Sequence, residues 1–278
     1  MKNQFENQVE RNMLLEDAYQ KAQALDNPIK MEDFSDLYKD AEKDLKYVEE
    51  MEMRFRQNQK EKTEIEVMFR KIAKIFEVIV SQQIELSNWL GESAITIQAS
   101  RYDDIHNGVD TIVGFDEESG PSHLALAIDV TSSHEIRKKF DKIKGEIDQG
   151  FLTEIKYFMS ENLSFRGHKS NVPRVVIGAD KGTILDLTEK WLDKDQKALA
   201  KHIIQTIIIE EIVSQLEAFI EYAESINKFE VAKIYQKTLS ILEKIKAEKD
   251  VSEDMLFKAN EDQVLFEIKD ILSYFKKQ

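Results

Sequence analysis

The chain contains no cysteine, which excludes disulfide bonds, thiolate nucleophiles and cysteine-bound zinc or iron–sulfur centres. It also contains little glycine and proline, with nine glycines and three prolines in 278 residues. All nine glycines lie between residues 91 and 182, together with two of the prolines. Because glycine and proline interrupt regular structure, we expect a punctuated α/β centre between two helical arms.

Positive charge is scarce as well. The chain has 39 basic and 53 acidic residues and a formal net charge of −14. This balance argues against a general attraction to nucleic acid or anionic lipid, although it is compatible with a local basic groove. The most apolar stretch, residues 203–220, is interrupted by glutamates and falls short of the roughly 20 apolar residues of a membrane span. The N-terminus has no apolar signal segment. We therefore predict a soluble cytoplasmic protein with no membrane partner.

Helical periodicity marks the N-terminal arm. Apolar residues recur every three or four positions from Phe34 to Phe55 and again from Ile65 to Ile79. Pro28 should separate an earlier helix, near residues 3–25, from the second one. We expect residues 1–65 to form a helical hairpin or a short coiled coil, which could mediate self-association or bind a protein partner.

The centre and the C-terminal arm have different patterns. Short β-branched or apolar runs predict strands at 94–99, 111–115, 123–131 and 172–179. Helical patterns are found at 66–90, 134–149, 195–225, 228–248 and 253–275. A helix between the third and fourth strands implies a parallel crossover. We therefore predict an αβββαβ core over residues 66–225 and a helical arm over residues 226–278.

Two acidic residues lie at the ends of predicted strands. Asp110 precedes the second strand, and Asp129 is near the end of the third. A charge at the end of an apolar strand is costly unless it is paired or metal-bound. Carboxylates that converge between neighbouring strands would suit Mg²⁺, which prefers oxygen ligands. The preceding helix offers Glu85 or Glu77 as a third carboxylate.

This order of elements and acids resembles the PD-(D/E)xK nuclease superfamily, whose core is restriction-endonuclease-like. Asp110 corresponds to the first motif acid, and Asp129-Val130-Thr131 corresponds to the (D/E)xK part, with threonine in place of the lysine. The resemblance implies a nuclease that hydrolyses phosphodiester bonds in DNA or RNA with Mg²⁺ or Mn²⁺ as cofactor. It implies that Asp110 and Asp129 bind metal and that Glu85 acts as ligand or base. In some members the lysine lies on the following helix, where this chain has Lys138 and Lys142.

Two basic groups are the candidate nucleic-acid contacts, one on the helix after the third strand and one around the last strand. They comprise Arg137, Lys139, Arg166, Lys169 and Arg174. A charged helix face is more often simply solvated. The alternative is therefore a non-catalytic interaction or scaffold protein with a degenerate nuclease-like core, and the net charge and Thr131 favour it.

Overall fold

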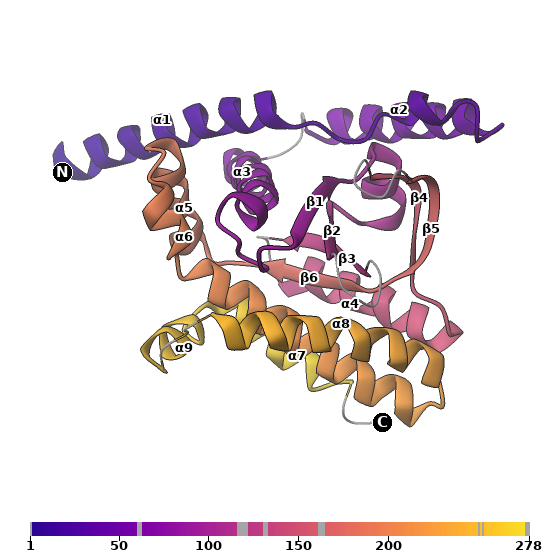
Figure 1. The fold of residues 1–278 in the computed structure, drawn as a ribbon. Coiled ribbons are helices and arrows are strands. Elements are labelled where there is room, and N and C mark those ends of the chain that lie inside the picture. The colour runs from indigo at the N-terminus through magenta and orange to yellow at the C-terminus, as the bar shows by residue number, and fades with distance from the viewer. Residues whose placement is uncertain are drawn as a thin grey trace.

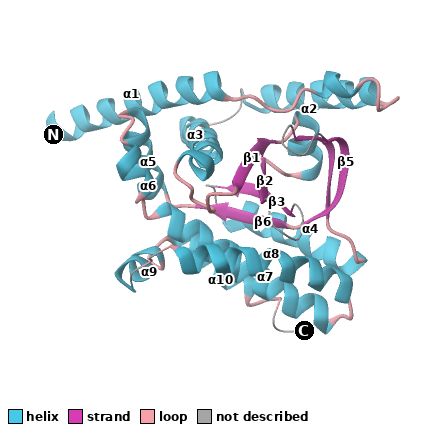
Figure 2. Ribbon diagram, viewed as in Figure 1, coloured by secondary structure: helices cyan, strands magenta, loops and turns pink. Residues whose placement is uncertain are grey.

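The computed structural model describes residues 2–59, 63–115, 122–129, 133–160, 165–249, 251 and 253–275. Its architecture is mixed α/β: a small mixed sheet lies between helical layers (Figures 1 and 2). Within these ranges, no helix has the length and apolar character that crossing a membrane requires.

The sheet contains β1 (Ala94–Gln98), β2 (Thr111–Phe115), β3 (Ser122–Asp129) and β6 (Arg174–Gly178), in that spatial order. β2 is antiparallel to both β1 and β3, whereas β6 runs parallel to β3. Helix α4 (Ser133–Gln149) lies between β3 and β6 along the chain, so the predicted parallel crossover is confirmed.

Helices cover the sheet. On one side α3 (Glu64–Leu86) packs along β1, and on the other α7 (Ile204–Ser225) packs on β6 and pairs with α8 (Phe229–Glu248) (Figure 1). Thr63 and Glu66 form a capping box at the start of α3, which satisfies backbone N–H groups there. After β6 the chain also forms α5 (Lys181–Leu192), α6 (Gln196–Ala200), α9 (Glu253–Ala259) and α10 (Gln263–Leu272).

The N-terminal helices do not pair with each other. α1 (Lys2–Leu25) packs on α3 and α5, whereas α2 (Ala41–Gln59) packs on the single 3₁₀ turn η1 (Met31–Phe34). The two helices lie end to end along one side of the molecule, so no hairpin forms between them (Figure 1). Their apolar stripes are instead used against the rest of the chain.

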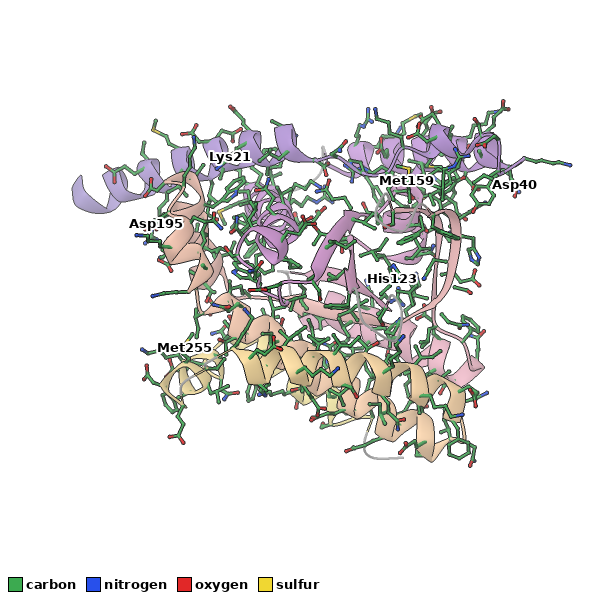
Figure 3. All side chains as sticks on the ribbon, viewed as in Figure 1. Lys21, Asp40, His123, Met159, Asp195 and Met255 are labelled. Carbon is green, nitrogen blue, oxygen red and sulfur yellow. The ribbon has the colours of Figure 1, made fainter. Side chains whose placement is uncertain are left out.

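One hydrophobic core connects the three predicted ranges. It contains fully buried Ala22 from α1, Ile79 from α3 and Leu265 from α10. At roughly 25 cal/mol for each Å² of apolar surface, such burial is the main stabilising term. Side chains fill the space between the layers, and His123 lies near the middle of the molecule (Figure 3).

The hairpin of β4 (Thr153–Ser160) and β5 (Phe165–Val172) is the main element that the sequence analysis missed. β5 is largely polar and exposed, and two register irregularities interrupt the ladder, so neither strand shows a regular alternation. The hairpin packs on β2 through a small cluster that includes Ile112, Ile155 and Phe158.

Three predicted helix bounds were wrong. The second N-terminal helix begins at Ala41, because η1 and a turn occupy residues 31–40. The helix predicted at 195–225 is broken between α6 and α7, and the one at 253–275 is broken between α9 and α10. In the last case Asp262 caps α10 by accepting hydrogen bonds from the N–H groups of Val264 and Leu265.

Candidate functional site

The segment between β1 and β2 forms a fixed loop at one end of the sheet. It contains a π-helical turn, η2 (Asp103–Asn107), and ends at Gly108 with φ +68°. Asp103 is fully buried and anchors this loop: its carboxylate accepts hydrogen bonds from the backbone N–H groups of Lys156 (2.8 Å) and Tyr157 (3.0 Å) on β4. The hairpin therefore fixes the loop that carries the neighbouring acid, Asp104.

Two carboxyl groups at this end of the sheet, those of Glu77 and Asp104, have raised pKa values, and the charge of Asp110 contributes to both. Burial, followed by the charge of Asp110, raises the pKa of Glu77 on α3 to about 7. The same two causes raise the pKa of Asp104 to about 6. Like charges raise an acid's pKa only when they are close and poorly screened. Glu77, Asp104 and Asp110 therefore form one electrostatic group, which we call the acid cluster.

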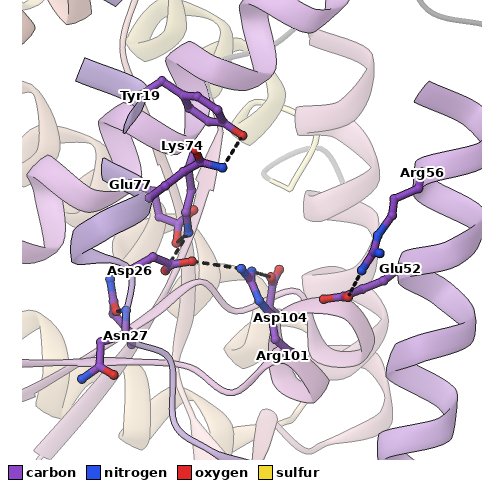
Figure 4. A network of polar contacts seen from close by, with 11 residues as sticks. Tyr19, Asp26, Asn27, Glu52, Arg56, Lys74, Glu77, Arg101 and Asp104 are labelled. Atoms are coloured by element: carbon purple, nitrogen blue, oxygen red, sulfur yellow. Dashed lines mark hydrogen bonds and ion pairs between the residues drawn. The ribbon is translucent and has the colours of Figure 1, made fainter. Parts of the chain in front are cut away.

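Two cations and one further acid complete the arrangement (Figure 4). Lys74 Nζ lies 2.9 Å from a Glu77 oxygen and 2.9 Å from Asp26. Arg101 contacts the other Asp26 oxygen at 2.9 Å and Asp104 at 3.2 Å. Burial alone would lower the pKa of Lys74, but Glu77 and Asp26 raise it above its usual value. A chain of alternating charges thus runs from Glu77 to Asp104.

The strand register places Asp129 at the same end of the sheet as Asp110. Thr111, which follows Asp110, pairs with Leu126 on antiparallel β3, and Asp129 is the last residue of that strand. Its backbone pairs with Gly178 on β6. The side chain of Asp129 lies outside the described residues, as does Thr131.

Glu85 lies elsewhere on α3. One of its carboxylate oxygens accepts hydrogen bonds from the backbone N–H (2.5 Å) and the hydroxyl (2.7 Å) of Thr96, in the middle of β1. Glu77 is the α3 carboxylate that senses the charge of Asp110. Of the two candidates on this helix, the structure brings Glu77 to the acid cluster.

The two lysines predicted on α4 differ in placement. Lys142 reaches the η2 loop, where its ammonium donates to the backbone oxygens of His106 (2.9 Å) and Asn107 (2.8 Å). Burial, followed by the charge of Arg174, lowers the pKa of Lys142 to about 8. Lys138 is exposed on the helix surface. Lys142 therefore holds the η2 loop in place by donating hydrogen bonds to the loop's backbone carbonyl oxygens.

The predicted nucleic-acid contacts do not form one surface. Arg174 is only 3% exposed and pairs with Glu146 at 2.8 Å, so it is an interior residue, which corrects its assignment as a surface contact. Arg137 pairs with Asp270 at 3.4 Å. Arg166 binds Asp36 in the N-terminal segment. Lys139 lies on α4, and Lys169 on β5 lies over the ring of Phe158.

Several residues of the site were missed or underrated from sequence. Lys74 and Glu77, like Arg101 and Asp104, are three apart on helical turns, a spacing that signals an ion pair. Asp26 gave no such signal, because it is 48 residues from Lys74 along the chain. Two of the histidines lie in aromatic contacts: His106 stacks on Tyr102, and His123 is buried against Phe158.

Comparison with known proteins gave no match: no family model matches the chain, and no curated protein or solved structure matches it.

Proposed function

We propose that this chain is a divalent-metal-dependent nuclease that hydrolyses phosphodiester bonds in DNA or RNA. One observation carries the proposal: at one end of the sheet Glu77 and Asp104 lie close enough to Asp110 for its charge to raise the pKa of both carboxyl groups. Strongly perturbed carboxylates gathered at one place are typical of catalytic sites, although structural ion pairs can produce them too.

The topology supports the same proposal. A helix, three strands, a crossover helix and a fourth strand parallel to the third follow one another, with strand order β1-β2-β3-β6. This arrangement resembles the restriction-endonuclease-like core, with the β4–β5 hairpin as an insertion before the last strand. In that resemblance the helix corresponding to α3 and the ends of β2 and β3 supply the acids.

The donor chemistry of the acid cluster fits a divalent cation. Four acids, namely Asp26, Glu77, Asp104 and Asp110, face two cations, Lys74 and Arg101, so the group has an excess of negative charge. Hard carboxylate oxygens are the ligands that Mg²⁺ and Mn²⁺ prefer. Among the described side chains no three such donors already converge as a metal site. In this proposal Glu77 and Asp110 hold the ion, and Asp129, whose strand ends at the same end of the sheet, is the further ligand that the resemblance implies.

The surrounding side chains have separate roles in this proposal. Bound Mg²⁺ would supply Lewis acidity at the phosphoryl group and lower the pKa of water. Glu77 would be a ligand of the ion; in the metal-free protein, burial and the charge of Asp110 raise its pKa to about 7, so ion binding would compete with a proton near neutral pH. Lys74 and Arg101 would donate hydrogen bonds to phosphate oxygens. Lys74 thereby supplies the charge that Thr131 does not.

Metal binding and cleavage test the proposal, with Glu85 as a matched control on the same helix. Wild type and Glu85→Gln should bind Mn²⁺ in calorimetry and cleave a nucleic acid from a panel of single- and double-stranded DNA and RNA. Glu77→Gln and Asp110→Asn should remain folded, bind the ion at least about tenfold more weakly, a loss of about 1.4 kcal/mol, and lose cleavage. Equal binding and cleavage by all four proteins would refute the site.

A lysine comparison tests the role of Lys74. Lys74→Gln should lose most of the cleavage, while Lys138→Gln, on the surface of α4, should keep it. The opposite result would place the catalytic lysine on α4.

The pairing of the predicted nucleic-acid contacts favours a second candidate, a non-catalytic interaction protein. Arg137 and Arg166 are already bound to acids of the same chain. This candidate predicts no metal binding and no cleavage, and a dimer in light scattering would support its self-associating form.

A further inference from the structure

The carboxylate of Asp26 bridges the two cations of the site (Figure 4). One oxygen lies 2.9 Å from Lys74 Nζ, and the other lies 2.9 Å from Arg101 Nη2. The side chain of Asp26 is only 14% exposed. Each cation already has a second acidic partner, Glu77 or Asp104. Asp26 therefore adds a negative charge where the neighbouring acids are already in excess.

Asp26 comes from a segment outside the site. It follows α1, and Asn27 and Ile29 cross the edge strand β1 by donating their N–H groups to Gln98, at 2.5 and 3.3 Å. We call residues 26–30 the strap. A hollow of about 510 Å³ lies between the strap and β1. Besides the ion pairs of Asp26, the strap is held by these two hydrogen bonds and by Ile29, which packs on the cluster that contains Phe34 and Tyr157.

Both ends of the strap are fixed. Ala22, at the end of α1, and Phe34, in η1, are fully buried. Pro28 lacks an N–H group and favours extended backbone before it. A movement of the strap would therefore be local, lifting Asp26 from the cations without detaching α1 or η1.

The carboxylate of Asp26 places one oxygen against each of the two cations. Another oxyanion with two free oxygens could bind in the same place. A phosphodiester group presents two non-bridging oxygens with the same requirement for N–H donors. We infer that Lys74 and Arg101 form a phosphate-binding subsite and that Asp26 occupies it as an internal competitor. The inference deepens the proposed nuclease function and rests on it for the identity of the substrate.

The chain therefore has a closed state in which the strap occupies the subsite. A substrate phosphate must displace Asp26 before it can reach the acid cluster. Phosphate binding and strap opening are then coupled, because phosphate has affinity for the open state only.

Neutralising Asp26 tests the subsite directly. Asp26→Asn should bind inorganic phosphate about tenfold or more tightly than wild type in calorimetry, because an internal competitor is removed. Asp33→Asn, which removes an exposed acid of η1, is the matched control and should behave like wild type. The double variant Asp26→Asn/Arg101→Gln should lose the gain. Equal phosphate affinity in wild type and folded Asp26→Asn would overturn the inference.

A second measurement uses the wild-type protein, in case the variant does not fold. Amide hydrogen exchange at Asn27 and Ile29 should be faster in phosphate than in chloride at equal ionic strength. Unchanged exchange would overturn the displacement of the strap.

The two proposals fail in different ways. Phosphate binding by Asp26→Asn without metal-dependent cleavage would keep the subsite and refute the nuclease. Cleavage by wild type without a gain in phosphate affinity would keep the nuclease and refute the role of Asp26.

Discussion

Replacing Glu77 with glutamine should make the stability of the protein less sensitive to pH. Burial, followed by the charge of Asp110, raises the pKa of Glu77 from 4.5 to about 7. The folded protein therefore holds this proton more tightly than the unfolded chain does. Its stabilising contribution is complete below pH 4.5 and is lost as the pH rises through about 7.

The pKa change sets the magnitude. At about 1.4 kcal/mol for each pKa unit, the contribution is about 3 kcal/mol at most. The side chain of Glu77 is 19% exposed, so solvent screening reduces this value modestly. We expect Glu77→Gln to gain about 2–3 kcal/mol over wild type between about pH 5 and about pH 8.5. This gain is roughly 6 °C in Tm. Effects of the substitution that do not depend on pH cancel in this comparison.

The assay is urea unfolding at the two pH values in EDTA, which removes divalent ions. Glu85→Gln, on the same helix but outside the acid cluster, serves as the control substitution. Parallel stability profiles for wild type and Glu77→Gln would refute the electrostatic description of the acid cluster. Adding Mn²⁺ near pH 8 should then raise the stability of wild type more than that of Glu77→Gln, because ligand binding stabilises the folded state.

Three further substitutions test other parts of the structure by the same unfolding assay. Glu211→Gln should stabilise the folded protein increasingly as the pH rises above about 4.5, because complete burial raises the pKa of Glu211. One oxygen of Glu211 also lacks a hydrogen-bond partner among the described residues. An equal change in stability at low and high pH would contradict this expectation. Arg174→Met should cost about 3 kcal/mol by leaving Glu146 without its partner, and adding Glu146→Gln should recover most of that loss. Gly108→Ala should cost about 1–2 kcal/mol, because φ is +68° there; an unchanged stability would show that the turn relaxes.

Much of the α/β centre was predictable because its signals are local. The buried strands around Ile112 and Val176 are short β-branched runs, and α3 shows a helical period. The hairpin was not predictable in this way, because β5 is polar and pairs irregularly with β4.

The choice between the two α3 carboxylates shows what sequence leaves open. Glu77 and Glu85 are eight residues apart, which is about 12 Å along a helix. β1 follows α3 and runs back along this helix. Glu85, near the end of α3, therefore contacts Thr96 in β1, whereas Glu77, two turns earlier, lies near the segment that follows β1. The sequence could not distinguish Glu77 from Glu85, because both positions fit the same helical repeat of apolar residues.

The sequence by itself determined the α/β centre, the crossover between β3 and β6 and the position of Asp110 before a buried strand. These features follow from local periodicity and from glycine and proline placement. Only the tertiary structure decided that Asp26 joins the Lys74–Glu77 pair to the Arg101–Asp104 pair. The physical reason is that an ion pair between distant segments depends on how α1, α3 and the η2 loop pack, and no local pattern encodes that contact.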